Sequence, residues 1–168
     1  MVSDSVLESG SLSGRNTLGL TAHADRVVAI TQSTQLEQAL TDARPFGPVT
    51  VLGGGSNVVM HPVQRGTVLL MDIKGRTLRA DDGGRVVLRV GAGENWHELV
   101  LWCHHHGLHG LANLALIPGS VGAAPIQNIG AYGVELKDCF ISCEGVHIEA
   151  KRLFELDLDG CEFGYRDS

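Results

Sequence analysis

The 168-residue chain has few cysteines, no excess of basic residues and no long apolar run. Its four cysteines form no CxxC pair and are too sparse for a disulfide framework, so we expect reduced thiols. A net charge of −6 disfavours a general nucleic-acid or membrane-surface binder, because such proteins need a basic surface. No apolar run approaches the roughly 18 to 20 residues of a membrane span, and the N-terminus does not resemble a signal peptide. We therefore expect a cytoplasmic protein.

Glycine is the abundant residue. The chain contains 22 glycines, roughly twice the number expected from an average usage of about 7%. The remaining composition, with 43% hydrophobic and 19% charged residues, is that of an ordinary globular domain that can bury a core. The positions of the glycines therefore carry information.

Patterns along the first 73 residues predict a mobile tail followed by a β-α-β unit. Residues 1–16 are polar and aperiodic, which is typical of a mobile terminus. Strands are predicted at 26–30 and 49–52 from their β-branched residues. A helix lies between them, starting at a capping-box pattern over 34–37 and ending before Pro45.

The rest of the chain predicts short strands around one helix. Asn95 is a candidate N-cap for a helix through His106, with a core face of Trp96, Leu99, Val100 and Cys103. Strands are predicted at 67–71, 77–80, 85–90, 139–148 and 152–158, with a hairpin turn at 81–84. Residues 117–133 are too rich in glycine, alanine and proline for a long regular element.

The stretch VTVLGGGSNVVM, residues 49–60, places three glycines directly after a strand. It lacks the third glycine and the following helix of a dinucleotide-binding fingerprint, and the Lys-Ser/Thr pair of a phosphate-binding P-loop. Two interpretations remain. The run is either a tight turn between strands or a nest of backbone N–H groups that binds an anion.

A second segment, residues 117–133, strengthens the anion interpretation. Residues 118–122 can start a short helix whose amides face a phosphate, and residues 130–133 offer a flat surface beside an aromatic ring. Together the two segments suggest a ligand with a diphosphate and a planar group, although close packing of elements also produces such loops. Arg166 is either part of a surface ion pair or a fork for a carboxylate or enolate.

Histidines and cysteines are weaker candidates. Consecutive histidines at 104–106 point about 100° apart on a helix, so they do not converge on one metal ion. Cys139 and Cys143 fall on one face of a predicted strand but too far apart to chelate. We therefore expect no metal site.

Four segments in register resemble a known family: GGGSNVV (53–59), VGAGENWHELV (90–100), LANLALIPGSVGAAPIQNIGAYGVEL (111–136) and CEFGYRDS (161–168). The chain from about residue 16 onward closely resembles the bacterial UDP-N-acetylenolpyruvoylglucosamine reductases, also called UDP-N-acetylmuramate dehydrogenases. The resemblance implies an α+β, FAD-binding fold of the p-cresol methylhydroxylase/vanillyl-alcohol oxidase type. In that fold, residues 17–73 would form a β-α-β subdomain and residues 74–168 an incomplete, mainly antiparallel one.

The resemblance also implies an activity. Family members use FAD and NADPH to reduce UDP-N-acetylglucosamine enolpyruvate to UDP-N-acetylmuramate, a cytoplasmic step of peptidoglycan synthesis for the cell wall. No residue matches the histidine or cysteine that links flavin covalently in some relatives of the wider fold, so we expect non-covalent FAD. We expect a monomer that binds neither nucleic acid nor membrane.

Site residues follow position by position from the resemblance. Arg166 matches the catalytic arginine that stabilises the enolate, and the resemblance implies that Tyr165 would help to hold substrate. The residues that match the cofactor-binding positions are Gly53, Gly54, Gly55, Ser56, Asn57, Pro118, Gly119, Ser120, Gly122, Ala123, Ile126, Gly130 and Tyr132.

The chain departs from the family at its end. Family members continue beyond GYRDS into a substrate-binding domain that carries a proton-donating serine and an assisting glutamate. We therefore expect a C-terminally truncated, FAD-binding portion that is not active alone. Two alternatives remain open: a non-catalytic flavin-binding remnant, and another flavin oxidoreductase of the wider fold, although GYRDS does not fit the latter.

Overall fold

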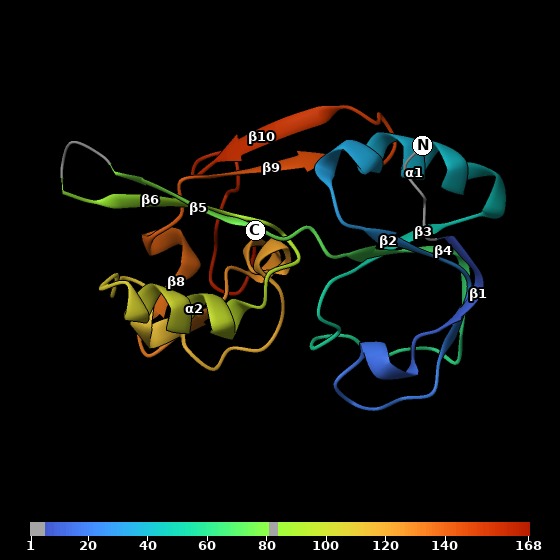
Figure 1. Cartoon of the computed structure of the whole chain (residues 1–168), viewed down its shortest axis with the longest axis horizontal. Coiled ribbons are helices and arrows are strands. Elements are labelled where there is room, and N and C mark those ends of the chain that lie inside the picture. The colour runs from blue at the N-terminus through green and yellow to red at the C-terminus, as the bar shows by residue number, and fades with distance from the viewer. Residues whose placement is uncertain (1–5, 81–83) are drawn as a thin grey trace. The chain divides into compact units, whose positions relative to one another are not determined.

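The computed structural model describes residues 6–80 and 84–168 (Figure 1). These residues form two compact units. The first unit extends to Ile73 and includes Val146–Leu153, and the second unit consists of Lys74–Gly145 and Phe154–Ser168. The sequence-based division placed 146–153 in the second subdomain. This segment instead clusters with the first unit, because Val146 packs against the apolar cluster of that unit.

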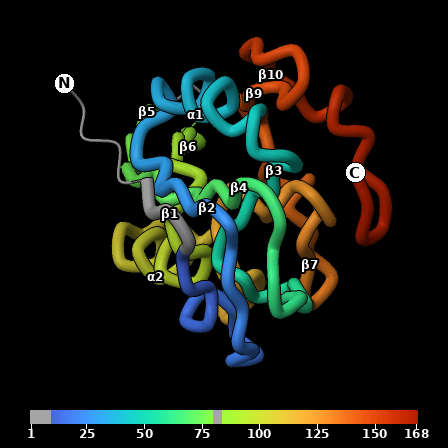
Figure 2. Tube along the Cα trace, turned by 90° about the vertical axis from the view of Figure 1, so that its right-hand side faces the viewer, coloured from blue at the N-terminus to red at the C-terminus, as the bar shows by residue number. Residues whose placement is uncertain are grey.

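The first unit is built on a four-stranded sheet. It consists of β1 (Val6–Ser11), β2 (His23–Ile30), β3 (Val49–Leu52) and β4 (Val63–Met71), in the order β1-β2-β4-β3. Both β2 and β3 run parallel to β4, whereas β1 is antiparallel to β2. Figure 2 shows β2, β4 and β3 in this succession. The predicted strand at 49–52 is confirmed at the same residues.

Two apolar clusters cover the two faces of this sheet. Along β4, Val68 belongs to one cluster and Leu69 to the other, because successive side chains of a strand point to opposite faces. Leu40 of α1 (Leu36–Ala43) packs with Leu69, so the helix covers that face, while Leu12 packs on the other. Figure 1 shows α1 and the loop containing η1 (Ser13–Arg15) on opposite sides of the sheet.

The predicted capping box at 34–37 is wrong. A 3₁₀ turn, η2 (Ser33–Gln35), precedes α1, and a second one, η3 (Arg44–Phe46), follows it. The side chain of Gln35 accepts hydrogen bonds from the backbone N–H groups of Thr31 and Gln32, at 2.9 and 3.0 Å. The capping box is therefore formed by Gln32 and Gln35, and not by Thr34 and Glu37 as predicted. The reason is that the first turn begins two residues earlier than predicted.

Residues 6–16, predicted to belong to a mobile tail, are part of the first unit. β1 pairs with β2, and the Leu12 side chain is fully buried. Asn16 fixes the following loop. Its amide nitrogen donates to the carbonyls of Leu12 and Leu20, and its oxygen accepts from the N–H of Leu20. The prediction failed because the segment is polar, and its order comes from strand pairing and one buried amide.

The second unit surrounds one helix, α2 (Trp96–His105), confirmed with Asn95 as its N-cap and with the predicted core face. The Asn95 side chain accepts from the N–H of Glu98 at 3.0 Å. The strands form two-stranded sheets. Figure 1 shows β5 (Arg76–Ala80) beside β6 (Val86–Val90), and β9 (Ser142–Val146) beside β10 (Leu153–Asp157). The third pair is β7 (Gly130–Ala131) with β8 (Val134–Glu135). Val146, the last residue of β9, and Leu153, the first residue of β10, belong to the first unit. The predicted turn at 81–84 lies mostly outside the described residues.

Residues 117–133 contain no long regular element, as predicted. Four short 3₁₀ turns stand in the second half of the chain: η4 (Ala112–Leu114), η5 (Val121–Ala123), η6 (Pro125–Gln127) and η7 (Leu136–Asp138). The predicted strand at 139–148 is too long, because Cys139 is the C-cap of η7 and β9 extends only from Ser142 to Val146. Cys139 therefore does not share a strand with Cys143. Among residues 6–80 and 84–168, no helix is long and apolar enough to span a membrane.

Candidate functional site

The glycine turn at 53–57 leaves β3 and leads to β4 without an intervening helix. Gly55 is buried and has a φ of 66°. A Cβ at this position would lie 1.9 Å from the carbonyl oxygen of Arg15, and the N–H of Thr17 donates to the Gly55 carbonyl at 3.1 Å. Gly55 is thus required by the close approach of the chain's own segment 15–17, whereas the resemblance assigned this glycine to cofactor binding.

Gly53 and Gly54 differ from Gly55 because both are exposed. Ser56 is half-buried and Asn57 is exposed. The turn therefore presents two adjacent residues without side chains at its surface, followed by two polar side chains. This arrangement allows a ligand to approach the backbone closely.

The second glycine segment lies along the residues that precede α2. Backbone hydrogen bonds join Val121 N–H to the Glu94 carbonyl at 2.9 Å and Gly122 N–H to the Ala92 carbonyl at 2.8 Å. A Cβ on Gly122 would lie 2.6 Å from the Cβ of Ala92. The absence of a side chain at 122 therefore permits a close contact between two segments of the second unit.

These hydrogen bonds limit the predicted phosphate contact of segment 118–122, because the amides of Val121 and Gly122 bond within the protein. For the amides of Gly119 and Ser120 the phosphate contact stays a prediction. The N–H groups of Val121 and Gly122 donate to the segment before α2. The next two N–H groups, of Ala123 and Ala124, donate to the carbonyls of Ser120 and Val121. Since a backbone N–H has one proton to donate, these four amides are committed within the protein. Ser120 is buried, whereas Pro118 and Gly122 have exposed surface.

The predicted flat surface at 130–133 is a hairpin. Tyr132 and Gly133 have φ values of 52° and 77° and connect β7 to β8, the backbone pattern of a type I′ turn. A Cβ on Gly130 would lie 3.0 Å from the Val134 carbonyl oxygen, so this glycine serves the hairpin. Tyr132 is 87% exposed and Ile126 is 70% exposed. The segment thus offers two large apolar side chains to solvent.

Arg166 lies against this segment, although the two are 36 residues apart in sequence. Its Nη2 donates to the carbonyl of Gly130 at 3.1 Å. Arg166 has a φ of 59°, which is costly for a residue with a Cβ, and such strain is often found at functional sites. Among the ion pairs of the described residues, none involves Arg166. Its neighbour Tyr165 is 84% exposed.

An ion pair holds the segment that precedes α2. Arg76 Nη2 lies 2.6 Å from Glu94 Oε2, and both side chains are largely buried. The N–H of Gly75 donates to Glu94 Oε1 at 2.9 Å, and Lys74 Nζ donates to the Gly93 carbonyl. The Gly75 N–H and the Arg76 guanidinium together hold the pKa of Glu94 below its ordinary value. This pair is not predictable from the sequence, because Arg76 of β5 and Glu94 before α2 are brought together only by tertiary contact.

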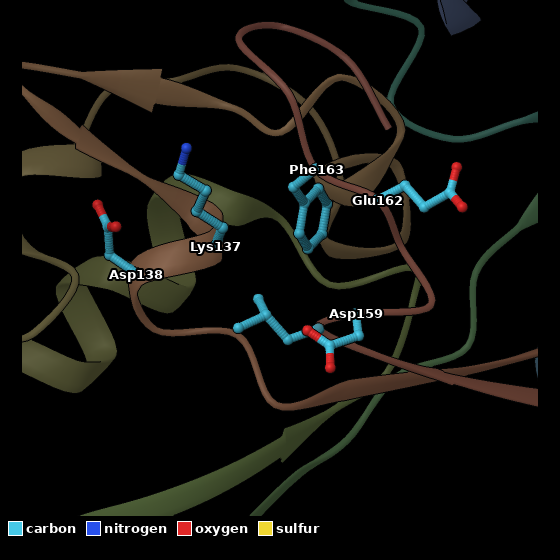
Figure 3. Close-up of a pocket in the computed structure, with 6 residues that line it drawn as sticks. Lys137, Asp138, Asp159, Glu162 and Phe163 are labelled. Carbon is cyan, nitrogen blue, oxygen red and sulfur yellow. The ribbon is translucent and has the colours of Figure 1, made fainter.

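A hollow of about 470 Å³ in the second unit contains none of the predicted site residues (Figure 3). It is lined by Lys137, Asp138, Leu158, Asp159, Glu162 and Phe163. Three of these residues are acidic, and Lys137 is already paired with Glu135 at 2.6 Å. A diphosphate is disfavoured in such surroundings because like charges repel.

The histidines at the end of α2 are exposed. The ring nitrogens Nδ1 of His105 and His106 lie 2.7 and 2.8 Å from the carbonyls of Leu101 and Trp102. Within the part of the chain that the structure describes, no group of three or more His, Cys, Asp or Glu side chains is placed to hold a metal ion. The cysteines, all free, include buried Cys103 and Cys161.

The two units divide the predicted cofactor residues. The first unit carries the glycine turn 53–57. The second unit carries the segment 118–132 together with Tyr165 and Arg166, which the hydrogen bond from Arg166 to Gly130 brings to one place. Within these groups, Gly53, Gly54, Asn57, Pro118, Gly122, Ile126, Tyr132, Tyr165 and Arg166 are exposed.

Comparison with known families identifies the chain's family. Residues 24–149 match the FAD binding domain model, so the chain belongs to this family of FAD-binding domains. The chain is also 47% identical over 165 residues to the UDP-N-acetylenolpyruvoylglucosamine reductase of Burkholderia cenocepacia, and 48% identical over the same length to that of Burkholderia pseudomallei.

The matches extend over nearly all of this chain but not over all of its relatives. They cover 98% of the chain and 47% of each of these two enzymes, so the chain spans about half the length of the curated relatives it matches. The crystal structure of the UDP-N-acetylenolpyruvylglucosamine reductase from Thermus caldophilus is similar, with a TM-score of 0.76 and 26% identity. That similarity covers 98% of this chain and 57% of the Thermus protein. The predicted family and α+β FAD-binding fold are thus confirmed.

Replacing Gly55 by alanine should destabilise the first unit. The new Cβ would overlap the Arg15 carbonyl, and the alanine backbone would have to adopt a left-handed conformation. Together these two effects should lower the free energy of unfolding by at least about 2 kcal/mol. Chemical denaturation of Gly55→Ala measures this loss. Gly14→Ala is the control, because a Cβ at Gly14 meets no heavy atom within 4 Å. Equal stability of the two variants would show that segment 15–17 does not pack on Gly55.

The Glu94 carboxylate should make the stability of the second unit depend on pH. Because folding lowers its pKa, its contribution is present above the unfolded pKa of about 4.5 and is lost as the pH falls through the lower folded value. Glu94→Gln should lower the free energy of unfolding at pH 7 by about 1–3 kcal/mol, since the buried Arg76 loses its charged partner. The difference from wild type should shrink below about pH 4.

Denaturation curves between pH 3 and pH 7 test this. Glu155→Gln, at an exposed position on β10, is the matched control and should change little. A Glu94→Gln penalty that persists unchanged in acid would contradict the role of the carboxylate.

Proposed function

We propose that the chain binds FAD non-covalently and supplies the FAD-binding part of an NADPH-dependent reductase. The reaction is the reduction of UDP-N-acetylglucosamine enolpyruvate to UDP-N-acetylmuramate, in peptidoglycan synthesis. The single observation that carries the proposal is 47% identity, over 98% of this chain, to enzymes named UDP-N-acetylenolpyruvoylglucosamine reductase. We further propose a cytoplasmic location, which follows from the same resemblance.

The residues present fit FAD, although not all in the predicted way. Exposed Gly53 and Gly54 leave backbone accessible to a diphosphate, and Ser56 supplies a hydroxyl donor. Ile126 and Tyr132 present exposed apolar surface suited to a planar ring system. Gly55, Gly122 and Gly130 support the site indirectly, because their missing side chains let segments of the protein pack closely.

Bound FAD would supply the two-electron reduction of the substrate's enol double bond. Arg166 would contribute the positive charge that stabilises the enolate during this reduction, since its planar guanidinium suits carboxylate and enolate oxygens. The hydrogen bond from Arg166 Nη2 to the Gly130 carbonyl holds that charge beside the predicted cofactor segment. Exposed Tyr165 would contact the substrate next to it.

A flavin-binding protein without reductase activity is the second candidate. The observation that favours it is the match of residues 24–149 to an FAD binding domain, which by itself concerns the cofactor and no particular reaction. Both candidates require FAD binding by these residues. NADPH consumption that depends on the UDP-sugar enolpyruvate distinguishes them.

The chain should retain FAD when purified and should be stabilised by it. At free FAD of about one hundred times the dissociation constant, mass action should add roughly 2.7 kcal/mol to the free energy of unfolding. Flavin absorbance after gel filtration and denaturation with and without FAD measure both effects. Gly54→Leu should weaken FAD binding, because it places a bulky side chain on the exposed turn. Gly14→Ala is the control, and failure of wild type to retain flavin would refute the proposal.

Arg166→Lys should preserve FAD binding but slow the reaction. In an enzyme that joins these residues to a substrate-binding domain, we expect a decrease in turnover of about a hundredfold, typical of losing one preorganised electrostatic contact. Lysine keeps the charge but not the planar fork. Steady-state NADPH oxidation measures the decrease. Unchanged turnover would contradict the role of Arg166.

A further inference from the structure

Asn128 is a fully buried polar side chain that was not among the predicted site residues. It ends η6 in the left-handed conformation, with a φ of 42°. Its amide nitrogen donates to the Gly164 carbonyl at 2.9 Å and to Glu135 Oε2 at 3.2 Å. Its amide oxygen accepts from the N–H of Lys137 at 3.1 Å. Both amide protons are therefore used, and one side chain joins three separate segments.

One of these segments is the turn that carries Arg166. Gly164 and Asp167 pair across this turn, and the Gly164 N–H donates to the Asp167 carbonyl at 2.9 Å. Arg166 lies between them with a positive φ, a conformation that the surrounding structure must impose. The Gly164 carbonyl that Asn128 binds thus belongs to the residue at the base of the turn.

The other contacts of this turn are exposed to solvent. Arg166 Nη2 donates to the Gly130 carbonyl and Ser168 Oγ to the Ile126 carbonyl, both at 3.1 Å. Water competes for both bonds because both side chains are exposed. The hydrogen bond from Asn128 to Gly164 is made by a buried amide, and a buried donor that loses its partner strongly destabilises the folded state. It is therefore the contact best able to hold the turn in place.

We propose that Asn128 is a positioning residue, whose amide fixes the turn 164–167 against the segment 126–130 and thereby sets the place of the Arg166 guanidinium. The role of Arg166 in catalysis rests on the proposed function. The positioning of the turn by Asn128 does not, because it concerns contacts within the second unit.

Glu135, which accepts a hydrogen bond from Asn128, allows a second test of this positioning role. Its pKa lies below the ordinary value, chiefly because Lys137 donates to it, with a further contribution from Asn128. The Asn128 amide therefore faces a carboxylate that is ionised at neutral pH. Asn128→Asp would place a second carboxylate there and leave no donor for the Gly164 carbonyl. In the double variant Asn128→Asp/Glu135→Gln, the amide introduced at position 135 restores a donor toward position 128, but Gly164 still lacks one.

The experiment is amide hydrogen exchange and ¹H–¹⁵N NMR on the 168-residue chain without FAD. Asn128→Gly retains the left-handed backbone and removes the side chain. We expect the Gly164 amide to exchange at least about tenfold faster and the signals of 165–168 to move toward those of a free peptide. Asn113→Gly, at an exposed position in η4, is the matched control and should leave these signals unchanged.

The double variant separates positioning from general stability. We expect it to regain much of the unfolding temperature that Asn128→Asp loses, while the signals of 164–168 remain displaced. The Glu135→Gln single variant reports the effect of losing the pair with Lys137. Recovery of the turn signals together with the unfolding temperature, or wild-type signals in Asn128→Gly, would overturn the proposal.

The FAD titration gives an independent outcome. If the chain fails to bind FAD but Asn128→Gly releases the turn, the proposed function fails and the positioning role stands. If FAD binds and Asn128→Gly leaves the turn unchanged, the positioning role fails and the proposed function stands.

Discussion

Close approach of one backbone segment to another is the constraint on which both candidate segments depend. Gly55 lies against the carbonyl of Arg15, and Gly122 lies against Ala92, at distances that leave no room for a Cβ. Each contact is accompanied by backbone hydrogen bonds, from Thr17 to Gly55 and from Gly122 to Ala92. Part of the glycine abundance is thus explained by packing within each unit.

This constraint changes which of the proposed cofactor residues are accessible to a ligand. Exposed Gly53 and Gly54 remain available to a diphosphate, whereas the amides at 121–124 are used by the protein itself. The glycines that pack within the protein help to position the exposed groups. Ile126, for example, follows closely after Gly122, which packs against Ala92. The proposed site would thus consist of two sets of residues, one that packs within the protein and one that contacts the ligand.

Buried polar groups complete the second unit. The Arg76–Glu94 pair holds the start of α2, whose neighbouring residues receive the second glycine segment. The Asn128 amide joins that segment to the turn of Arg166. Both are satisfied by specific partners, so removing one partner costs more than an exposed contact would. Arg166 itself remains exposed, which is compatible with the substrate contact proposed for it.

Local sequence by itself determined the helix α2, its Asn95 cap, the strand β3 and the glycine turn that follows it, because periodicity, capping and turn chemistry act over a few residues. The four motifs also determined the family. Only the tertiary structure decided that the polar segment containing Asn16 belongs to the first unit and that Gly55 serves it. The tertiary structure also decided the contacts of Arg166 with Gly130 and of Asn128 with Gly164. Each contact joins residues 36 positions apart, and at that separation the spacing in the sequence carries no information about distance.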